Sequence, residues 1–381
     1  MRLFNYLASA FTDPDRKRSA GGDSLFTLDG VRGLAVLIVI ASHTNVFGMA
    51  GLGSLGVLLF FMLSGFVLTL PFVDRPEHIF SWRTLWHFYA NRALRVVPVY
   101  LVAVIYIAWL LGEGWSWVFA NISFVSGWTH LWSVAEEVRF YLLFPPVVAV
   151  LALLPNVRVR ILALLAMIWL AWRLQYHHKI DMMTGVSVRF FFWFFLAGML
   201  ACFLYRIFLT PVANSPTVQR ALGAAAIFVV VCIFTSSNGA VSVLWSWLAP
   251  ELVARYSGFN GWHQPALWCV LLGVLLLSVS TSRDTLVARW MRSWFMRQIG
   301  LLSYSLYLFH VPVMIVLRTY KLETGWLFAA TFAIGYLIAM MTYLTIEKPF
   351  LMLKPGAASG QEKFSDNVPP MRNRGNIREV A

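Results

Sequence analysis

The sequence predicts an all-α membrane protein that crosses the bilayer about ten times. Of its 381 residues, 59% are hydrophobic and only 12% are charged, whereas soluble domains carry about 25% charged residues. Apolar runs long enough to cross a bilayer core of about 30 Å recur along the chain. The polar connections between these runs are rich in lysine and arginine. A soluble globular protein with this composition is excluded.

Ten apolar runs are predicted to be membrane-spanning helices. In chain order they cover 30–48, 54–73, 95–111, 139–154, 159–175, 189–209, 219–235, 265–280, 299–317 and 326–346. The run 241–249 is too short to cross and is expected to lie at the membrane interface. Residues 1–27 and 351–381 are polar, so we expect flexible tails on either side of a membrane domain over 28–350.

The distribution of basic residues predicts the orientation. With ten spans, 23 of the 30 lysines and arginines fall on the side that holds both termini. Because cytoplasmic loops carry the excess of positive charge, both termini are expected in the cytoplasm. The net charge of +13 is then explained by anchoring to membrane lipids, and no nucleic-acid partner is expected.

The first run carries an arginine and a histidine on one stripe of its helix. In LDGVRGLAVLIVIASHTNVF, Arg32 and His43 are eleven residues apart, which is three turns plus roughly 20° and about 16 Å of rise. If Arg32 lies at a membrane face, His43 lies near the middle of the bilayer. Ionisable groups at such depth usually mark a functional site. The alternative is a histidine that simply bonds to a neighbouring helix.

Two arginines lie at 88–100, in the cytoplasmic approach to the third span. In FYANRALRVVPVY, Arg92 and Arg95 are three apart, so on a helix both guanidinium groups point the same way. Such groups bind phosphates in a bidentate manner, and together with Arg32 they would suit a polyanion from the cytoplasm. Ordinary anchoring by positive charge explains the pair equally well.

An acidic pair enters the fourth run from the outer side. In THLWSVAEEVRFYLLFPP these are Glu136 and Glu137. A carboxylate that met His43 would hold one tautomer of the imidazole and stabilise its protonated form. The alternative is that both glutamates are solvated.

A second histidine lies in the ninth run. In GLLSYSLYLFHVPVM, His310 is about 16 Å beyond Ile299, and Tyr304 and Tyr307 precede it by two turns and one turn. Two histidines at similar depth suggest a proton relay or a metal. Further ligands at metal spacing are lacking, so no metal site is expected.

Seven motifs, taken together and in this order, resemble acyltransferase family 3, the integral-membrane O-acyltransferases of bacteria. They are LDGVRGLAVLIVIASH, GVLLFFMLSGFVLT, NRALRVVP, LWSVAEEVRFYLLFP, RFFFWFFLAGMLA, SYSLYLFHVPV and IEKPF. The resemblance extends from Leu28 to Phe350. The family pattern selects Glu137 rather than Glu136. The chain departs from this pattern at Val134 and Arg139, and the second departure leaves the charge balance around Glu137 open.

The resemblance implies transfer of an acyl group, usually acetyl, from cytoplasmic acyl-CoA to a hydroxyl. The acceptor would be an extracytoplasmic glycan or lipid-linked saccharide, and the location the bacterial inner membrane. On this reading Arg32, Arg92 and Arg95 hold the CoA phosphates, His43 is the general base and Glu137 orients it. His310 and Tyr307 are secondary candidates.

The rival hypothesis is a proton-coupled transporter or flippase of a saccharide or small polar substrate. In such a protein His43, His310 and Glu137 would relay protons or bind the substrate. The sequence shows no clear internal repeat, which many transporters have.

Overall fold

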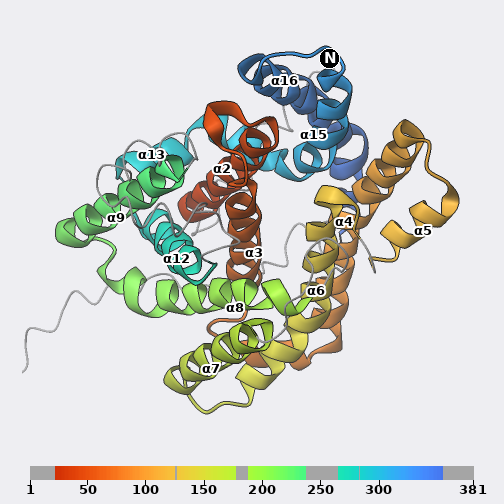
Figure 1. The fold of residues 1–381 in the computed structure, drawn as a ribbon. Helices are drawn as coiled ribbons and strands as arrows, with labels where there is room; N and C mark the ends of the chain where they lie inside the picture. Colours follow the sequence, from red (N-terminus) through yellow and green to blue (C-terminus); the bar gives the residue numbers. More distant parts are fainter. Residues whose placement is uncertain (1–21, 125–126, 177–187, 237–264, 283, 355–381) are drawn as a thin grey trace, which may run out of the picture.

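The computed structural model describes residues 22–124, 127–176, 188–236, 265–282 and 284–354, and within these ranges all regular elements are helices (Figure 1). The longer helices are α2 (Gly22–Thr44), α3 (Gly53–Thr69), α4 (Trp82–Leu111), α6 (Trp132–Ala152), α7 (Val157–Tyr176), α8 (Val188–Leu204), α9 (Pro216–Thr235), α12 (Pro265–Thr281), α15 (Ser303–Arg318) and α16 (Thr324–Thr342). Short helices connect or extend them: α5 (Trp115–Ile122), α13 (Leu286–Met291), α14 (Trp294–Leu301) and α17 (Lys348–Met352). Each of the ten predicted runs coincides with one of the longer helices.

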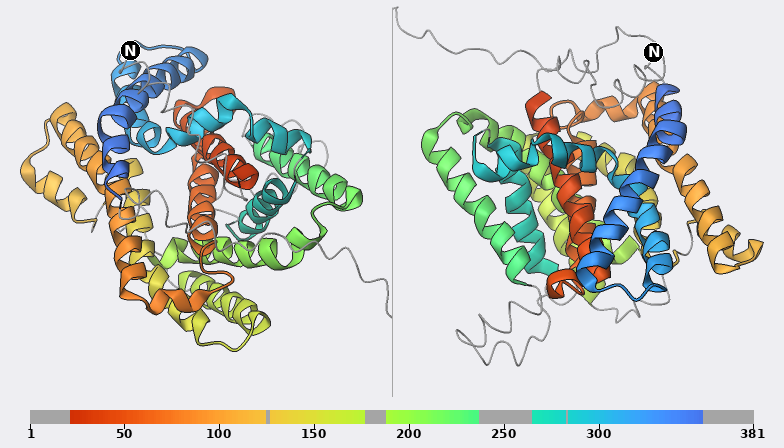
Figure 2. Two further views of the ribbon diagram at one scale, coloured as in Figure 1. Left: turned by 180° about the vertical axis from the view of Figure 1, so that it is seen from behind. Right: turned by 90° about the horizontal axis from the view of Figure 1, so that it is seen from above.

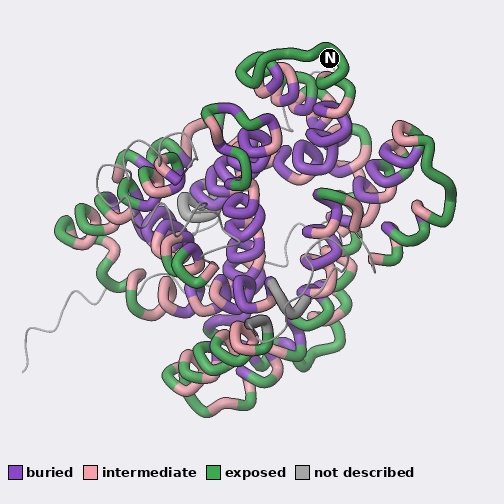
Figure 3. The backbone as a smooth tube through the Cα atoms, viewed as in Figure 1, coloured by how far each residue is buried: buried purple, intermediate pink, exposed green. Residues whose placement is uncertain are grey.

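Helices α2 and α3 form the centre of the bundle, and the other helices surround them (Figures 1 and 2). In the candidate span Thr27–Thr44 of α2, 83% of the residues are buried, against 22% in Pro216–Thr235 of α9. Figure 3 shows the same concentration of buried residues at the centre of the bundle, where α3 is almost entirely buried. The candidate span of α2 is therefore largely enclosed by protein.

The outer helices expose large apolar side chains. Trp109, Trp169 and Trp326 are 75%, 60% and 70% exposed, and many leucines and phenylalanines are exposed as well. Exposed apolar surface of this extent would not be stable in water but suits contact with lipid tails. The described fold is therefore that of a membrane protein.

Close contacts between backbones hold the central helices together. Where α3 crosses α8, a Cβ on Gly65 would overlap the carbonyl oxygen of Phe195, and a Cβ on Gly198 would overlap that of Met62. Where α14 crosses α2, a Cβ on Gly300 would overlap the carbonyl oxygen of Asp29. Small residues allow this approach, which strengthens van der Waals packing where the hydrophobic effect is weak.

Replacing Gly198 by valine is expected to destabilise the protein by about 1–3 kcal/mol or more, because α3 and α8 must move apart. The measurement is thermal unfolding in detergent. Gly325→Ala is the matched control, since a Cβ there has no heavy atom within 4 Å. Equal melting temperatures for the Gly198 variant and the wild type would refute the close-packing interpretation.

The number of membrane crossings is supported only in part. Among the described residues, five helices are long and apolar enough to cross, or six if the bent pair α14 and α15 forms one span. Two further apolar helices, α3 and α12, are shorter than the usual span. Ten crossings and cytoplasmic termini stay predictions. The predicted interfacial run 241–249 and most of both predicted tails lie outside the described residues.

Several predicted spans have different boundaries in the structure; α4, for example, begins at Trp82 and not at 95. The run 299–317 is not one straight helix, because α14 ends at Leu301, α15 begins at Ser303, and the two are bent by 73°. Helix α2 begins at Gly22, inside the predicted tail 1–27, and ends at Thr44. His43 therefore lies in the last turn of its helix.

Candidate active site

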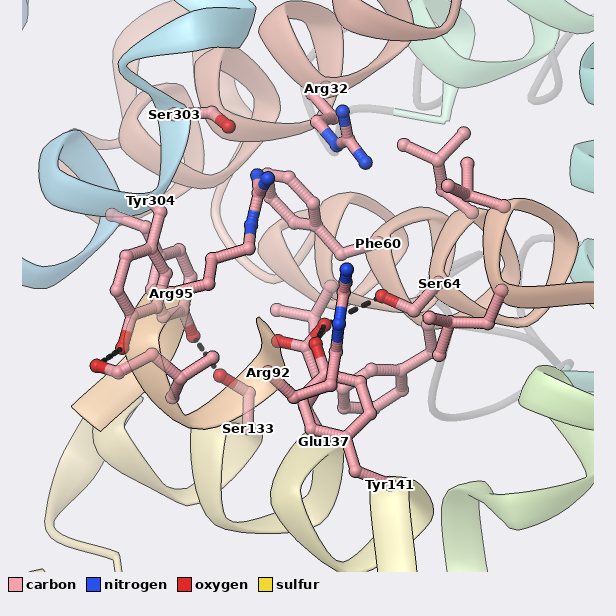
Figure 4. A pocket seen from close by; sticks show the side chains of 17 residues that line it. Arg32, Phe60, Ser64, Arg92, Arg95, Ser133, Glu137, Tyr141, Ser303 and Tyr304 are labelled. Atoms are coloured by element: carbon pink, nitrogen blue, oxygen red, sulfur yellow. Dashed lines mark hydrogen bonds between the residues drawn. The ribbon is translucent and has the colours of Figure 1, made fainter. Parts of the chain in front are cut away.

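Three arginines from two helices converge on one cavity, which we call the arginine cavity. Arg32 reaches it from α2, and Arg92 and Arg95 reach it from α4 (Figure 4). Its other lining residues come mainly from α3, α6 and α15: Ser64, Ser133, Glu137, Tyr141, Ser303, Tyr304 and Tyr307. The fold thus brings together the two arginine motifs that the sequence singled out, although they are far apart along the chain.

The lining of the arginine cavity holds three arginines and one carboxylate, that of Glu137. Arg32 donates to Asp29 at 2.9 Å, one turn earlier on α2. Within the described residues, Arg92 and Arg95 form no ion pair with a carboxylate, and the Nε of Arg92 is buried without a hydrogen-bond partner. The guanidinium of Arg92 lies 6.0 Å from the centre of the Tyr141 ring, which favours a cation. Buried guanidinium donors of this kind suit an anionic ligand.

Glu137 belongs to the arginine cavity and does not contact His43. Its Oε1 accepts hydrogen bonds from Ser64 Oγ and Tyr141 Oη, both at 2.6 Å (Figure 4). No hydrogen bond joins Glu137 to His43 in the described part of the chain. The expected orienting contact is therefore not formed, because α6 presents this carboxylate to the arginines of α4 and to α3.

The departure from the family pattern at Arg139 does not alter the surroundings of Glu137. Arg139 Nη1 pairs with Glu136 Oε1 at 2.9 Å, and its Nη2 donates to the Phe124 carbonyl at 2.7 Å. Glu136 is 1% exposed and carries the counter-charge of this arginine. The two neighbouring glutamates thus have separate partners.

His43 pairs with His310 of α15. The Nδ1 of His43 and the Nε2 of His310 are 2.8 Å apart, and the two ring planes differ by 7°. His310 is fully buried, whereas His43 is half-buried at the edge of a second cavity. The residue that meets His43 is thus the secondary candidate His310.

The hydrogen bonds of the pair assign the tautomers of both rings when both are neutral. The Nδ1 of His310 lies 2.6 Å from the carbonyl oxygen of Tyr307, which can only accept, so Nδ1 carries the proton. The Nε2 of His310 is then an acceptor, and His43 donates its Nδ1–H to it. The Nε2 of His43 therefore keeps its lone pair, as a general base requires.

A third histidine stabilises the helix that carries His310. Pro312 has no N–H, so the carbonyl of Leu308, four residues earlier in α15, lacks its usual helical partner. His130, in the turn before α6, donates its Nε2–H to this carbonyl at 2.9 Å. Burial lowers the pKa of His130 to about 3, so its ring is neutral, and Nδ1 lies 3.1 Å from Thr129 Oγ1.

The second cavity, which we call the histidine cavity, lies at the end of α2. Its lining includes His43, His130, Trp132, Arg318 and the two serines Ser42 and Ser54. Val57 and Tyr307 line both cavities, which therefore lie next to each other. Tyr307 is held there by hydrogen bonds between its Oη and Ser133 Oγ at 2.7 Å and the His130 carbonyl at 2.9 Å.

Reasoning from sequence missed two residues of the histidine cavity, His130 and Arg318. His130 lies inside the THLWSVAEEVRFYLLFPP motif, so the motif itself carried a signal. Arg318 gave none, because a single arginine at the end of an apolar run forms no motif with its neighbours. No group of three or more metal-ligating side chains occurs among the residues that the structure describes.

Comparison with known proteins gives one family and several relatives. Residues 25–344 match a family model described as an acyltransferase domain. The chain is 28% identical over 364 residues to the peptidoglycan O-acetyltransferase OatA of Listeria monocytogenes, covering 85% of this chain and 55% of that protein. It is 24% identical over 362 residues to the O-acetyltransferase OatA of Staphylococcus aureus, covering 84% of this chain and 56% of that protein. The chain thus spans little more than half the length of these relatives. No solved structure gives a significant match.

Proposed function

The chain belongs to the acyltransferase 3 family, and from this membership we propose that it is a membrane O-acetyltransferase. In this proposal it takes an acetyl group from acetyl-CoA on the cytoplasmic side of the bacterial inner membrane. It transfers this group to a hydroxyl of an extracytoplasmic glycan or lipid-linked saccharide. The names of the relatives support the acetyl group and the glycan acceptor.

The observation that carries the proposal is the presence of two unlike cavities along one helix. Arg32 and His43 both lie on α2, about 16 Å apart in rise, and they line the arginine cavity and the histidine cavity respectively. The two cavities share Val57 and Tyr307 in their linings, so they lie next to each other. Two substrates bound from opposite sides could therefore react in the protein without either crossing the membrane whole.

The arginine cavity is the proposed site of the CoA phosphates. Arg92 and Arg95 carry charge that no carboxylate of the described chain neutralises by ion pairing. Guanidinium groups bind phosphate oxygens through bidentate, charge-assisted hydrogen bonds. Glu137 lies beside these arginines, and its bonds to Ser64 and Tyr141 hold it as a fixed counter-charge. Its role in the proposal is to order the arginines, in place of orienting His43.

The histidine pair supplies the proposed base. The Nε2 of His43 accepts the proton of the acceptor hydroxyl as that oxygen attacks the thioester carbonyl carbon. The new C–O bond forms, the C–S bond breaks, and the imidazolium returns the proton to the departing thiolate. Throughout, His310 accepts the Nδ1–H of His43, which stabilises the imidazolium and preserves the tautomer.

The test uses purified protein in sealed vesicles. Acetyl-CoA with a labelled acetyl group is enclosed inside, and a hydroxyl-bearing oligosaccharide is added outside. Ester-linked label in the outer saccharide, released by mild base, is the expected result. Movement of unmodified saccharide into the vesicles without any ester would instead favour the transporter hypothesis and refute the acetyltransferase.

Arg92→Gln and Arg95→Gln are each expected to raise the KM for acetyl-CoA by about tenfold to a hundredfold, because each removes a charge-assisted contact to phosphate. The turnover number should change less. The measurement is initial rate against acetyl-CoA concentration, repeated with 3′-dephospho-acetyl-CoA.

Arg83→Gln is the matched control, since Arg83 is an exposed arginine on the same helix. An unchanged KM in the Arg92 and Arg95 variants would leave membrane anchoring as the explanation of both arginines.

A further inference from the structure

Arg318 joins the end of α15 to the end of α2. Its Nη2 donates to the carbonyl oxygen of His43 at 2.8 Å, although the two residues are 275 positions apart. His43 lies in the last turn of α2, where carbonyl groups lack an N–H partner within the helix. This bond links the exposed guanidinium to the residue that carries the proposed base, and Arg318 lines the same cavity.

This guanidinium has no counter-ion within the described chain. Arg318 forms no ion pair with a carboxylate there, and the lining of the histidine cavity contains no aspartate or glutamate. Capping one carbonyl uses one N–H, whereas a guanidinium has five. The remaining donors suit an oxyanion, which guanidinium groups bind in bidentate geometry.

Membrane anchoring does not explain the position of Arg318. In the proposed orientation α15 ends on the outer side, which holds seven of the 30 lysines and arginines. The positive-inside rule predicts depletion of arginine on that side. The positive-inside rule therefore does not account for an arginine beside the base on that side.

The rest of the cavity wall suits a saccharide. Trp132 contributes an aromatic side chain to the lining, and Ser42, Ser54 and Thr129 contribute hydroxyl groups. Ligand sites commonly combine apolar or aromatic walls with a few placed polar groups.

We propose that Arg318 recognises an anionic acceptor, a saccharide that bears a carboxylate or a phosphate near the hydroxyl that is acylated. The anion binds the donors of Arg318 that do not cap α2. The attachment of Arg318 to the His43 backbone then sets the hydroxyl beside His43 Nε2. This inference rests on the proposed function and makes Arg318 a specificity-determining residue for the acceptor.

The experiment compares three forms of one oligosaccharide: a uronic acid form, its carboxyl-reduced neutral form, and a phosphorylated form. The wild type is expected to favour an anionic form over the neutral one by about tenfold to a hundredfold in kcat/KM. Comparing kcat/KM for the uronic acid form with that for the phosphorylated form identifies which oxyanion is recognised. Equilibrium binding of the same three saccharides measures recognition without turnover.

Arg318→Gln is the informative variant, because glutamine keeps a side-chain amide donor but carries no charge. It is expected to raise the KM for the anionic acceptor and to abolish the preference over the neutral form, without a change in the KM for acetyl-CoA. Lys321→Gln, which removes an exposed charge just beyond α15, is the control and should keep the preference.

Two results would overturn the inference. One is a wild type that binds and acylates the neutral and anionic forms equally. The other is an Arg318→Gln variant that keeps the preference or loses activity equally on all acceptors, as expected of a helix cap alone. Acylation of the neutral acceptor in either case would leave the proposed acetyltransferase function intact.

Discussion

His43→Gln is expected to lower the turnover number by about a hundredfold to ten-thousandfold, the range that a positioned general base contributes. Glutamine cannot take up the proton of the acceptor hydroxyl. The bond from Arg318 goes to the backbone carbonyl of residue 43, so the substitution leaves this link between α15 and α2 in place. The measurement is the initial rate of acetyl transfer, with thermal unfolding in detergent to show that the variant is folded.

His78→Gln serves as the control for this experiment, because His78 is exposed and lines neither cavity. Its activity should equal that of the wild type. A His43→Gln variant that folds normally and transfers acetyl at more than a tenth of the wild-type rate would contradict the assignment of His43 as the base.

His310→Leu is expected to lower the turnover number by about a hundredfold or more while the KM for acetyl-CoA stays constant. Leucine fills much of the same space but cannot accept the Nδ1–H of His43. That imidazole is then free to adopt the other tautomer, which carries its proton on Nε2 and cannot act as a base at that atom. Loss of the orienting partner in a Ser-His-Asp triad has a comparable cause and costs about ten-thousandfold.

Two further variants separate a positioning role from a structural one. His310→Gln keeps an acceptor and is expected to recover part of the activity. The double variant of His43→Gln and His310→Leu should lose no more activity than His43→Gln alone, since groups that act as one unit are not additive. The proposed joint action of the two histidines would be contradicted if the activity losses of the single variants multiplied in the double variant. It would also be contradicted if His310→Gln recovered no activity.

The chain's helices and motifs were predictable from sequence because the signals lie within single helices. Each of the ten apolar runs became a helix. The three-residue spacing of Arg92 and Arg95 placed both on one face, and both line the arginine cavity with Arg32. Arg32 and His43 both lie on α2, as predicted. The helix ends at Thr44, whereas the apolar run was predicted to continue to residue 48.

Contacts between helices were not predictable in the same way. The expected partner of His43 was Glu137, but the structure pairs it with His310, 267 residues away. This pairing determines the tautomer of the proposed base. The position of Arg318 likewise depends on a contact between residues far apart in the sequence, its hydrogen bond to the His43 carbonyl.

The sequence by itself determined the all-helical membrane character, the family motifs, and which residues share a helical face. The tertiary structure alone decided which faces meet. Helical periodicity relates residues three or four positions apart, whereas contacts across helices depend on crossing points. Those crossing points are set by close backbone approach at residues such as Gly65, Gly198 and Gly300. The histidine pair exists because that packing brings the end of α2 against the middle of α15.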